Sequence, residues 1–346
     1  MSNNVENVFI LGAGASFDYD APLMSNFIDK AEDLMYSNSF EDREKVARIF
    51  NLITDLQRVH AKSYMDLDNI ETLFGFLEMG LVIKKLGKYK EDEIKELKDS
   101  LVYVIVNTLF KSIDLIKVRE NTGYKLLANY LKEIKTESAI ITFNYDVALD
   151  YELIQKNIPF DYCLNDTAME SNKKKYCKLH GSLNWYTSEN EEIRPTKFDE
   201  NRKNEVMPLG GSAKRRIISY LPPDNKLPVI IPPTWNKSTY HGQIANVWHH
   251  AANALSTAKN IYIIGYSLPE SDAFFKYLFS LGTLGESRIR RLWVFNPDEK
   301  VEANYNKMVG KGIENRFEFH DKGFDEAMKY ISNKDDIKPK TTLSVI

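Results

Sequence analysis

The chain has few cysteines and no long apolar run. Only two of its 346 residues are cysteines, Cys163 and Cys177, and neither belongs to a Cys-x-x-Cys pair. This spacing argues against a zinc module, and reduced thiols are typical of a cytoplasmic protein. No apolar stretch approaches the roughly 20 residues that cross a bilayer, and residues 1–7 lack the basic and apolar regions of a signal peptide. We therefore expect a cytoplasmic chain with no metal and no membrane partner.

A strong excess of either charge is also missing. Lysine and arginine total 46, aspartate and glutamate total 49, and the formal net charge is −3. This balance argues against a chain whose main task is to coat nucleic acid. Basic clusters at residues 173–175, 214–216 and 288–291 keep a DNA-acting subunit open as an alternative, although such runs are usually solvated faces. Hydrophobic residues make up 43% of the chain, which excludes a disordered or collagen-like protein.

Short apolar runs that end in turns recur along the chain. The first covers residues 8–11, and others cover 139–143, 229–231, 261–264 and 292–295. Helical patterns follow several of these runs, at residues 147–156, 271–281 and 299–309. Alternating strands and helices predict an α/β fold with a Rossmann-like, doubly wound parallel sheet.

Residues 22–135 do not follow this alternation. They are rich in Leu, Ile, Lys and Glu, with apolar residues at helical spacing, and they predict a large helical insertion of four or five helices after the first strand. The insertion is a candidate cover for a cleft or an oligomer interface, or it simply caps the sheet. We expect a single domain over residues 1–333, with a surface excursion at 188–226 and a tail at 334–346.

Five local patterns are candidates for chemistry because each follows a strand-like segment. Four of them follow apolar runs named above, and the His180 pattern follows a further short strand. Glycines in the first allow a backbone to approach a diphosphate, whose oxygens free amides can bind. Phe17 stands where the ordinary dinucleotide fingerprint has its third glycine, so a hydride-transferring dehydrogenase is disfavoured. A tight turn without a ligand stays open. The five patterns are Gly12-Ala13-Gly14-Ala15-Ser16, Asn144-Tyr145-Asp146, His180-Gly181, Gly265-Tyr266-Ser267 and Asn296-Pro297-Asp298.

Each of the other patterns has a structural alternative. Asn144 and Asp146 stand where open α/β sheets bind ligands, but either also suits a helix N-cap. Histidine can serve as a general base near neutral pH, which makes His180 a candidate, although a lone histidine is more often structural. Glu71 begins a helix of the insertion, and Asn69 before it suits a helix cap; we do not place Glu71 among the catalytic residues.

In this order the five patterns resemble the sirtuin-like fold, and specifically the NAD-hydrolysing branch found in bacterial anti-phage defence systems. The resemblance covers residues 5–333, and the segments 231–235 and 265–269 also look like the antiviral branch. The chain departs from sirtuin deacylases in three ways. It cannot build their four-cysteine zinc module, and Phe143 replaces the glutamine that they place before the asparagine. The glycine turn is followed by Phe17-Asp18-Tyr19-Asp20 in place of their GIPDFR-like segment. The resemblance therefore implies an NAD⁺ glycohydrolase that uses water as acceptor and releases nicotinamide and ADP-ribose.

The resemblance also implies a role for each pattern. Asn144 would hold the nicotinamide ribose or the attacking water, Asp146 the carboxamide, and His180 would act as the base. Asn296 would contact the adenosine ribose. The diphosphate would bind Gly12, Ala13, Gly14, Ala15, Ser16, Gly265 and Ser267.

Unregulated NAD hydrolysis would kill the host cell, so the resemblance implies control by a sensor. In relatives this is a HerA-type ATPase, a short prokaryotic Argonaute or a fused domain. Because no second domain follows residue 333, we expect a separate sensor chain, a homo-oligomer and no direct contact with nucleic acid. A non-catalytic NAD or ADP-ribose sensor and a zinc-free deacylase are the alternatives.

Overall fold

The computed structural model describes most of the chain, and the statements below concern this part. It comprises residues 4–115, 121–165, 172–206, 215–223, 226–231, 242–269, 273–285 and 288–335. Of the predicted features, the segment 232–235, the helix start at 271–272, Lys214 and the tail from 336 onward lie outside the described residues.

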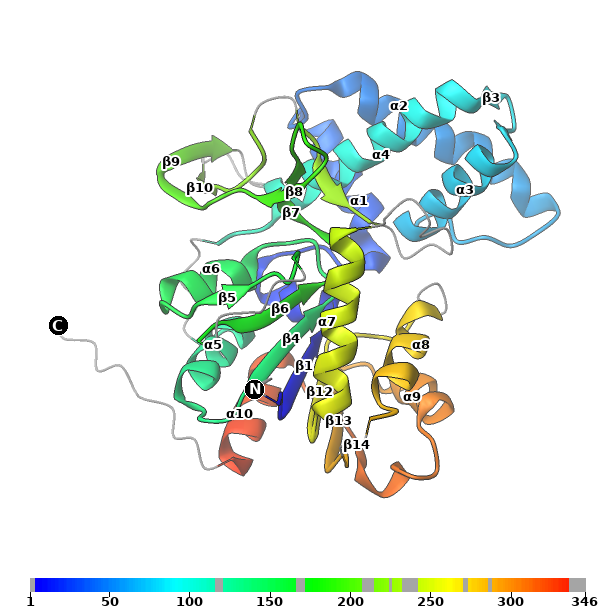
Figure 1. The fold of residues 1–346 in the computed structure, drawn as a ribbon. Helices are drawn as coiled ribbons and strands as arrows, with labels where there is room; N and C mark the ends of the chain where they lie inside the picture. The colour runs from blue at the N-terminus through cyan, green and yellow to red at the C-terminus, as the bar shows by residue number, and fades with distance from the viewer. Residues whose placement is uncertain are drawn as a thin grey trace.

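A parallel sheet of seven strands forms the centre of the described structure (Figure 1). Every residue of its central strand β1 (Asn7–Leu11) is buried, as expected for a strand covered on both faces. The predicted doubly wound sheet is therefore confirmed. Its strand order is β14 (Phe317–His320), β13 (Arg291–Phe295), β12 (Asn260–Ile264), β1, β4 (Ser138–Thr142), β6 (Lys174–Lys178) and β5 (Phe160–Asp161).

The register of the sheet aligns the carboxyl ends of six strands. Leu11 pairs with both Ile264 and Thr142. Thr142 pairs in turn with Lys178 on the far side. In the other direction Ile264 pairs with Phe295, and Phe295 with His320. Whatever follows these residues in the sequence is therefore brought to one edge of the sheet.

Helices cover both faces of the sheet because its side chains alternate. Phe9 and Leu11 belong to one apolar core, and Val8 and Ile10 to the other. The first core includes buried residues of three helices, α5 (Gly123–Glu133), α6 (Ala148–Gln155) and α10 (Phe324–Lys334). The second includes those of α7 (Gln243–Thr257), α8 (Ala273–Gly282) and α9 (Glu302–Met308).

The predicted large helical insertion after the first strand is present, but the predicted range 22–135 extends too far, because α5 within it packs with α6 and α10 on the face of the sheet. The longest of its helices, α4, has 22 residues and packs against the other three. In Figure 1 the insertion lies beyond the carboxyl ends of β1 and β4, where the predicted site residues gather. It contains α1 (Phe27–Tyr36), α2 (Arg43–Leu56), α3 (Ile70–Val82), the short hairpin of β2 (Lys85–Leu86) and β3 (Tyr89–Lys90), and α4 (Glu91–Ser112).

Smaller antiparallel sheets occupy the predicted surface excursion and its flanks. The apolar run at 229–231 falls largely in β11 (Pro228–Ile230), which pairs antiparallel with β7 (Gly181–Thr187) and so lies outside the parallel sheet. A short β-branched run indicates a strand but does not select its partner. The remaining small strands are β8 (Ile193–Pro195), β9 (Asp199–Val206) and β10 (Arg215–Ser219).

The described residues contain neither a membrane-spanning helix nor a metal-binding cluster. None of the described helices combines the length and apolarity needed to cross a membrane. Within the same residues, no group of three or more His, Cys, Asp or Glu side chains is arranged to hold a metal ion.

Candidate functional site

A cavity of about 630 Å³ lies at the carboxyl edge of the sheet. This volume is within the range of about 300–1,000 Å³ that small-molecule and cofactor sites occupy. The insertion lines one side of the cavity, and the loops after β1, β4, β6, β12, β13 and β14 line the other. The lining includes these predicted site residues: Ala13, Gly14, Ser16, Asn144, Asp146, His180, Gly265, Ser267 and Asn296.

The glycine turn after β1 is packed against the loop after β12. A Cβ atom at Gly12 would lie 2.5 Å from the Cα of Tyr266, and one at Gly265 would lie 2.4 Å from the amide nitrogen of Ala15. Gly265 also has a φ of 63°, which disfavours any side chain. The glycines of both loops are therefore required by the close approach of two backbones at the point where the strand order reverses.

This packing uses several of the turn's amides. The N–H of Gly12 donates to Ile264 O at 3.0 Å, that of Gly14 to Gly265 O at 2.9 Å, and that of Ala15 to Gly12 O at 2.9 Å. The sequence interpretation treated the amides of this turn as free for a diphosphate. The structure instead commits three of them to the loop contact and to a 3-10 helix over Ala13–Tyr19.

Asn144 ties the glycine turn to the end of β4. Its Nδ2 donates to Gly12 O at 2.8 Å, to Ser16 Oγ at 3.0 Å and to the hydroxyl of Tyr124 at 3.1 Å. The residue is 9% exposed. All of the hydrogen bonds that its side chain makes to described residues use Nδ2, so Oδ1 is the atom left to meet a ligand.

Ser16 connects this hydrogen-bond network to Asp146. The Ser16 hydroxyl donates to Asp146 Oδ2 at 2.6 Å. Because that hydrogen is committed, Tyr124 is the donor in its 2.8 Å contact with Ser16. The other oxygen, Oδ1, accepts from the backbone N–H of Ala148, the first residue of α6, at 2.9 Å. The N-cap position of α6 is Val147, so the N-cap role predicted for Asp146 is wrong, although its side chain still bonds the first residue of the helix.

The electrostatic environment of Asp146 opposes its ionisation. Burial raises the pKa of its carboxyl group above the ordinary value, while Lys178 and the Ser16 hydrogen bond act in the opposite direction. The Lys178 ammonium lies 2.5 Å from the backbone oxygen of Asp146 and 3.3 Å from the carboxylate of Asp150. Lys178 is itself fully buried. It bonds the loop after β4 through the Asp146 backbone oxygen and is not among the residues that line the cavity.

His180 reaches the same cavity from the end of β6. Asn144 and His180 each stand two residues beyond the paired positions Thr142 and Lys178, and both line the cavity. The imidazole is buried and meets the ring of Phe143 edge-on at 5.2 Å. Phe143 in turn stacks on Tyr266 at 4.2 Å. The residue that departs from the sirtuin pattern therefore serves as an aromatic wall for the histidine.

Ser267 and Asn296 occupy the half of the cavity formed by β12 and β13. Ser267 is exposed, and its backbone oxygen accepts from Asn304 at 3.1 Å. Asn296 is buried, and its Oδ1 accepts from the backbone N–H of Asp298 at 2.9 Å. Asn296 lines the cavity, and no described residue accepts a hydrogen bond from its Nδ2.

Sequence reasoning missed several residues of the site. Tyr124 lies on α5, 20 residues before Asn144, and nothing in its local sequence marks it. Lys322 enters the cavity lining from the loop after β14, and Asp325 from the first turn of α10; β14 is a strand that the apolar pattern does not predict. Glu71 lines the cavity as well, while Asn69 Oδ1 accepts from the Glu71 N–H at 2.8 Å and confirms the predicted cap.

When the chain is compared with known proteins, similarity is found to solved structures alone. No family model and no curated protein matches the chain. A Sir2 homologue in complex with NAD shares 12% identity over 96% of this chain and 91% of that chain, with a TM-score of 0.45. Sir2 with the inhibitor EX-527, 2′-O-acetyl-ADP-ribose and a deacetylated p53 peptide shares 14% identity over 96% and 95%, with a TM-score of 0.41. Strand order and register alone therefore establish the architecture described above.

Proposed function

We propose that the chain is an NAD⁺ glycohydrolase, which cleaves the nicotinamide–ribose bond with water as the acceptor. One observation carries the proposal. The aligned strand ends gather a glycine turn, an Asn-x-Asp loop, a His-Gly loop, a Gly-x-Ser loop and a strand-end asparagine around one cavity. These are the patterns that resemble the NAD-hydrolysing branch of the sirtuin-like fold.

The dinucleotide would lie across the switch point between β1 and β12. Ala13, Gly14, Ser16 and Ser267 line the part of the cavity that would hold the diphosphate, whereas Gly12 and Ala15 are not among its lining residues. Ala13 has the amide that the loop contact leaves available. Asn296 would offer its Nδ2 to the adenosine ribose. Lys322 is the lysine of the cavity lining, and its charge would complement the diphosphate. Ser16 acts through Asn144 and Asp146 as a positioning residue, because its hydroxyl is already committed.

The nicotinamide ribose would face Asn144 and His180. When the C1′–N1 bond breaks, its electron pair neutralises the pyridinium ring, so the leaving group needs no proton. Water then adds its oxygen to C1′, and the water proton passes to His180. The products are nicotinamide, ADP-ribose and one proton. Asn144 Oδ1 would hold the ribose or the water, and Asp146 the carboxamide.

The test is release of nicotinamide and ADP-ribose from NAD by the wild type and by His180→Ala. We expect the variant to lose about 10²- to 10⁴-fold in rate while it still binds NAD and keeps its melting temperature. His249→Ala is the matched control, because His249 is an exposed histidine on α7 and the rate should not change. Full turnover by folded His180→Ala would exclude His180 as the base.

The same assay separates the alternatives. Binding of NAD or ADP-ribose by the wild type without any nicotinamide release would identify a sensor. Nicotinamide release that depends on an acyl-lysine peptide would identify a deacylase. Product analysis would also distinguish linear from cyclic ADP-ribose.

We further propose that the activity serves as a regulated NAD-depleting effector in the cytoplasm. The resemblance to the anti-phage branch supports this role, together with a sensor on a separate chain of the HerA-type ATPase or short Argonaute kind. Activity that rises when such a partner is added to the purified chain would support it, and full activity of the chain alone would contradict it.

A further inference from the structure

A second cavity lies at the opposite edge of the parallel sheet. It has a volume of about 460 Å³ and is lined by Lys259, Arg288, Ile289, Arg290 and Arg316. These residues immediately precede β12, β13 and β14. The first cavity lies at the other end of the same strands. Strands of four or five residues at about 3.3 Å per residue put roughly 15 Å between the two.

The backbone fixes the basic residues around this hollow. The N–H of Arg290 donates to Lys259 O at 2.6 Å, and the N–H of Arg291 donates to the same oxygen at 3.2 Å. Ile289 is 7% exposed and belongs to an apolar core, so it anchors the segment that carries Arg288 and Arg290. The backbone positions of the basic residues are thus fixed by the strands that they precede.

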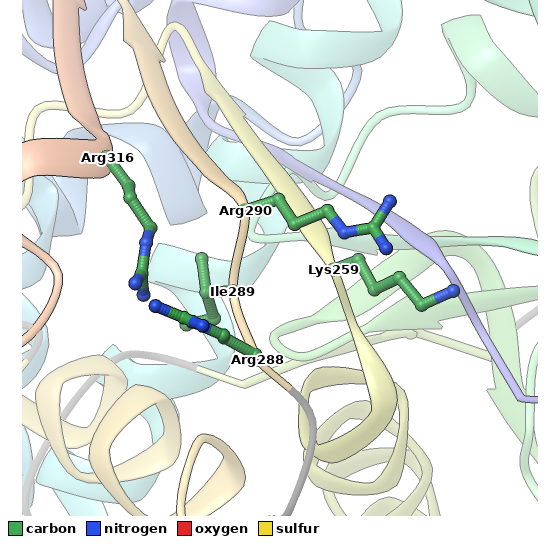
Figure 2. Close-up of a pocket in the computed structure, with 5 residues that line it drawn as sticks. All are labelled: Lys259, Arg288, Ile289, Arg290 and Arg316. Atoms are coloured by element: carbon green, nitrogen blue, oxygen red, sulfur yellow. The ribbon is translucent and has the colours of Figure 1, made fainter.

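The side chains converge in pairs. In Figure 2 the guanidinium groups of Arg288 and Arg316 point toward each other, although they come from the approaches to different strands. Arg290 and Lys259 extend together toward the other side of the strand. Arg288 and Arg290 are exposed, while Lys259 and Arg316 are half-buried. All four therefore remain accessible to a solute.

These charges are poorly neutralised within the described part of the chain. Lys259 lies 3.4 Å from Glu6, and no described carboxylate lies within ion-pair distance of Arg288, Arg290 or Arg316. The adjacent Arg291 is a contrast, because it pairs with Asp335 at 2.6 Å. Like charges that share a hollow repel one another, and a bound anion would relieve that repulsion.

We propose that this hollow, formed by Lys259, Arg288, Arg290 and Arg316, binds a small phosphorylated ligand that carries at least two negative charges. Guanidinium groups match phosphate oxygens in a two-pronged geometry, which favours a phosphate over a simple halide. The whole chain has a net charge of −3, which favours a small anion over the long polyanionic backbone of a nucleic acid. The site stands independently of the function proposed above.

The test is titration calorimetry with inorganic pyrophosphate on the full chain, in which the variants described next assign the binding to this hollow. Arg288→Gln combined with Arg316→Gln should weaken pyrophosphate binding at least about tenfold, because two hydrogen bonds to a charged group are lost. Lys307→Gln combined with Lys311→Gln removes the same charge from exposed positions and should leave the affinity unchanged. Melting temperatures of both variants should match the wild type.

Three outcomes would overturn the inference. The first is that pyrophosphate does not bind the wild type. The second is that both double variants bind it equally well. The third is that a single-stranded DNA oligonucleotide binds more tightly than pyrophosphate, with a steep salt dependence, and loses affinity in the arginine variant; the hollow would then be a nucleic-acid surface. Failure of NAD turnover would leave all of these measurements interpretable.

Discussion

Asn144 joins three distant segments of the chain through a single side-chain nitrogen. Gly12, Ser16 and Tyr124 all accept from it, so the end of β4, the turn after β1 and helix α5 are held together behind the cavity. A buried network of this kind is stable only when all of its members are satisfied. We therefore expect substitution of Asn144 to affect folding as well as the proposed chemistry, so substitutions of its neighbours are more informative.

Tyr124→Phe tests the positioning role of this network. The change removes the hydroxyl that contacts Ser16 and Asn144, and we expect a loss of about 1–2 kcal/mol in unfolding free energy. We also expect a lower kcat for nicotinamide release with little change in KM. Tyr130→Phe on the same helix is the control, because its hydroxyl binds Asp335 instead. Equal kinetic effects of the two variants would show that Tyr124 contributes stability only.

Asp146→Asn tests the electrostatics of the buried carboxyl group. Burial raises its pKa above the ordinary 3.8 in the folded protein. The unfolded state then loses this proton first, so the residue's contribution to stability falls as pH rises from about 3.8 through the folded pKa. The asparagine variant has no such ionisation. The melting temperature of the wild type minus that of the variant should therefore decrease over this interval, and a constant or increasing difference would contradict the raised pKa.

At the scale of elements, two loops that follow β1 and β12 act as one unit. Glycine on both sides lets the backbones touch, and the Gly14 N–H donates across the contact at 2.9 Å. The turn therefore has a packing role, whether or not it also binds the proposed diphosphate. Its shape depends on β12, which follows β1 by more than 240 residues in the sequence.

Gly265→Ala is the sharpest test of this contact. A Cβ atom there would lie 2.4 Å from the Ala15 nitrogen, at a φ of 63°. We expect a loss of roughly 2–5 kcal/mol in unfolding free energy and loss of NAD binding. Gly75→Ala in α3 is the control, since nothing lies within 4 Å of its added atom. It should be neutral or stabilise by up to about 1 kcal/mol. Urea titration of both variants measures the difference.

At the scale of the whole molecule, the helical insertion completes the cavity that the sheet begins. Phe27, Ile70 and Leu109 line it from α1, α3 and α4. The insertion also carries exposed apolar side chains near the end of α3, including Val82 at 52% and Ile83 at 62%. The segment that covers the cavity is thus also the candidate for contact with another chain.

We expect the purified chain to form a homo-oligomer, with the insertion as its interface. Size-exclusion chromatography with light scattering should give a mass above that of one chain. Val82→Glu combined with Ile83→Glu should reduce this mass toward the monomer without lowering the melting temperature. A strict monomer with full basal activity would contradict both the assembly and the proposed control.

Much of the architecture is predictable because a buried strand or helix shows its burial in the apolar pattern of its own residues. Apolar runs at 8–11, 139–143, 261–264 and 292–295 become β1, β4, β12 and β13 because strands covered on both faces need continuous apolar sequence. Helical spacing in residues 22–135 likewise predicts the insertion. β14, with the sequence Phe-Glu-Phe-His, is only half-buried at the edge of the sheet, and its weak pattern explains why it was missed.

The sequence by itself determined which residues follow strands, and hence that Asn144, His180 and Asn296 were candidates. Only the tertiary structure decided which strands are neighbours, that Tyr124 joins the network, and that the amides of Gly12, Gly14 and Ala15 are already used. It alone also brought Lys259, Arg288 and Arg316 around one hollow. The physical reason is that apolar periodicity is a property of a segment, whereas the choice among similar apolar strands depends on how the whole chain packs.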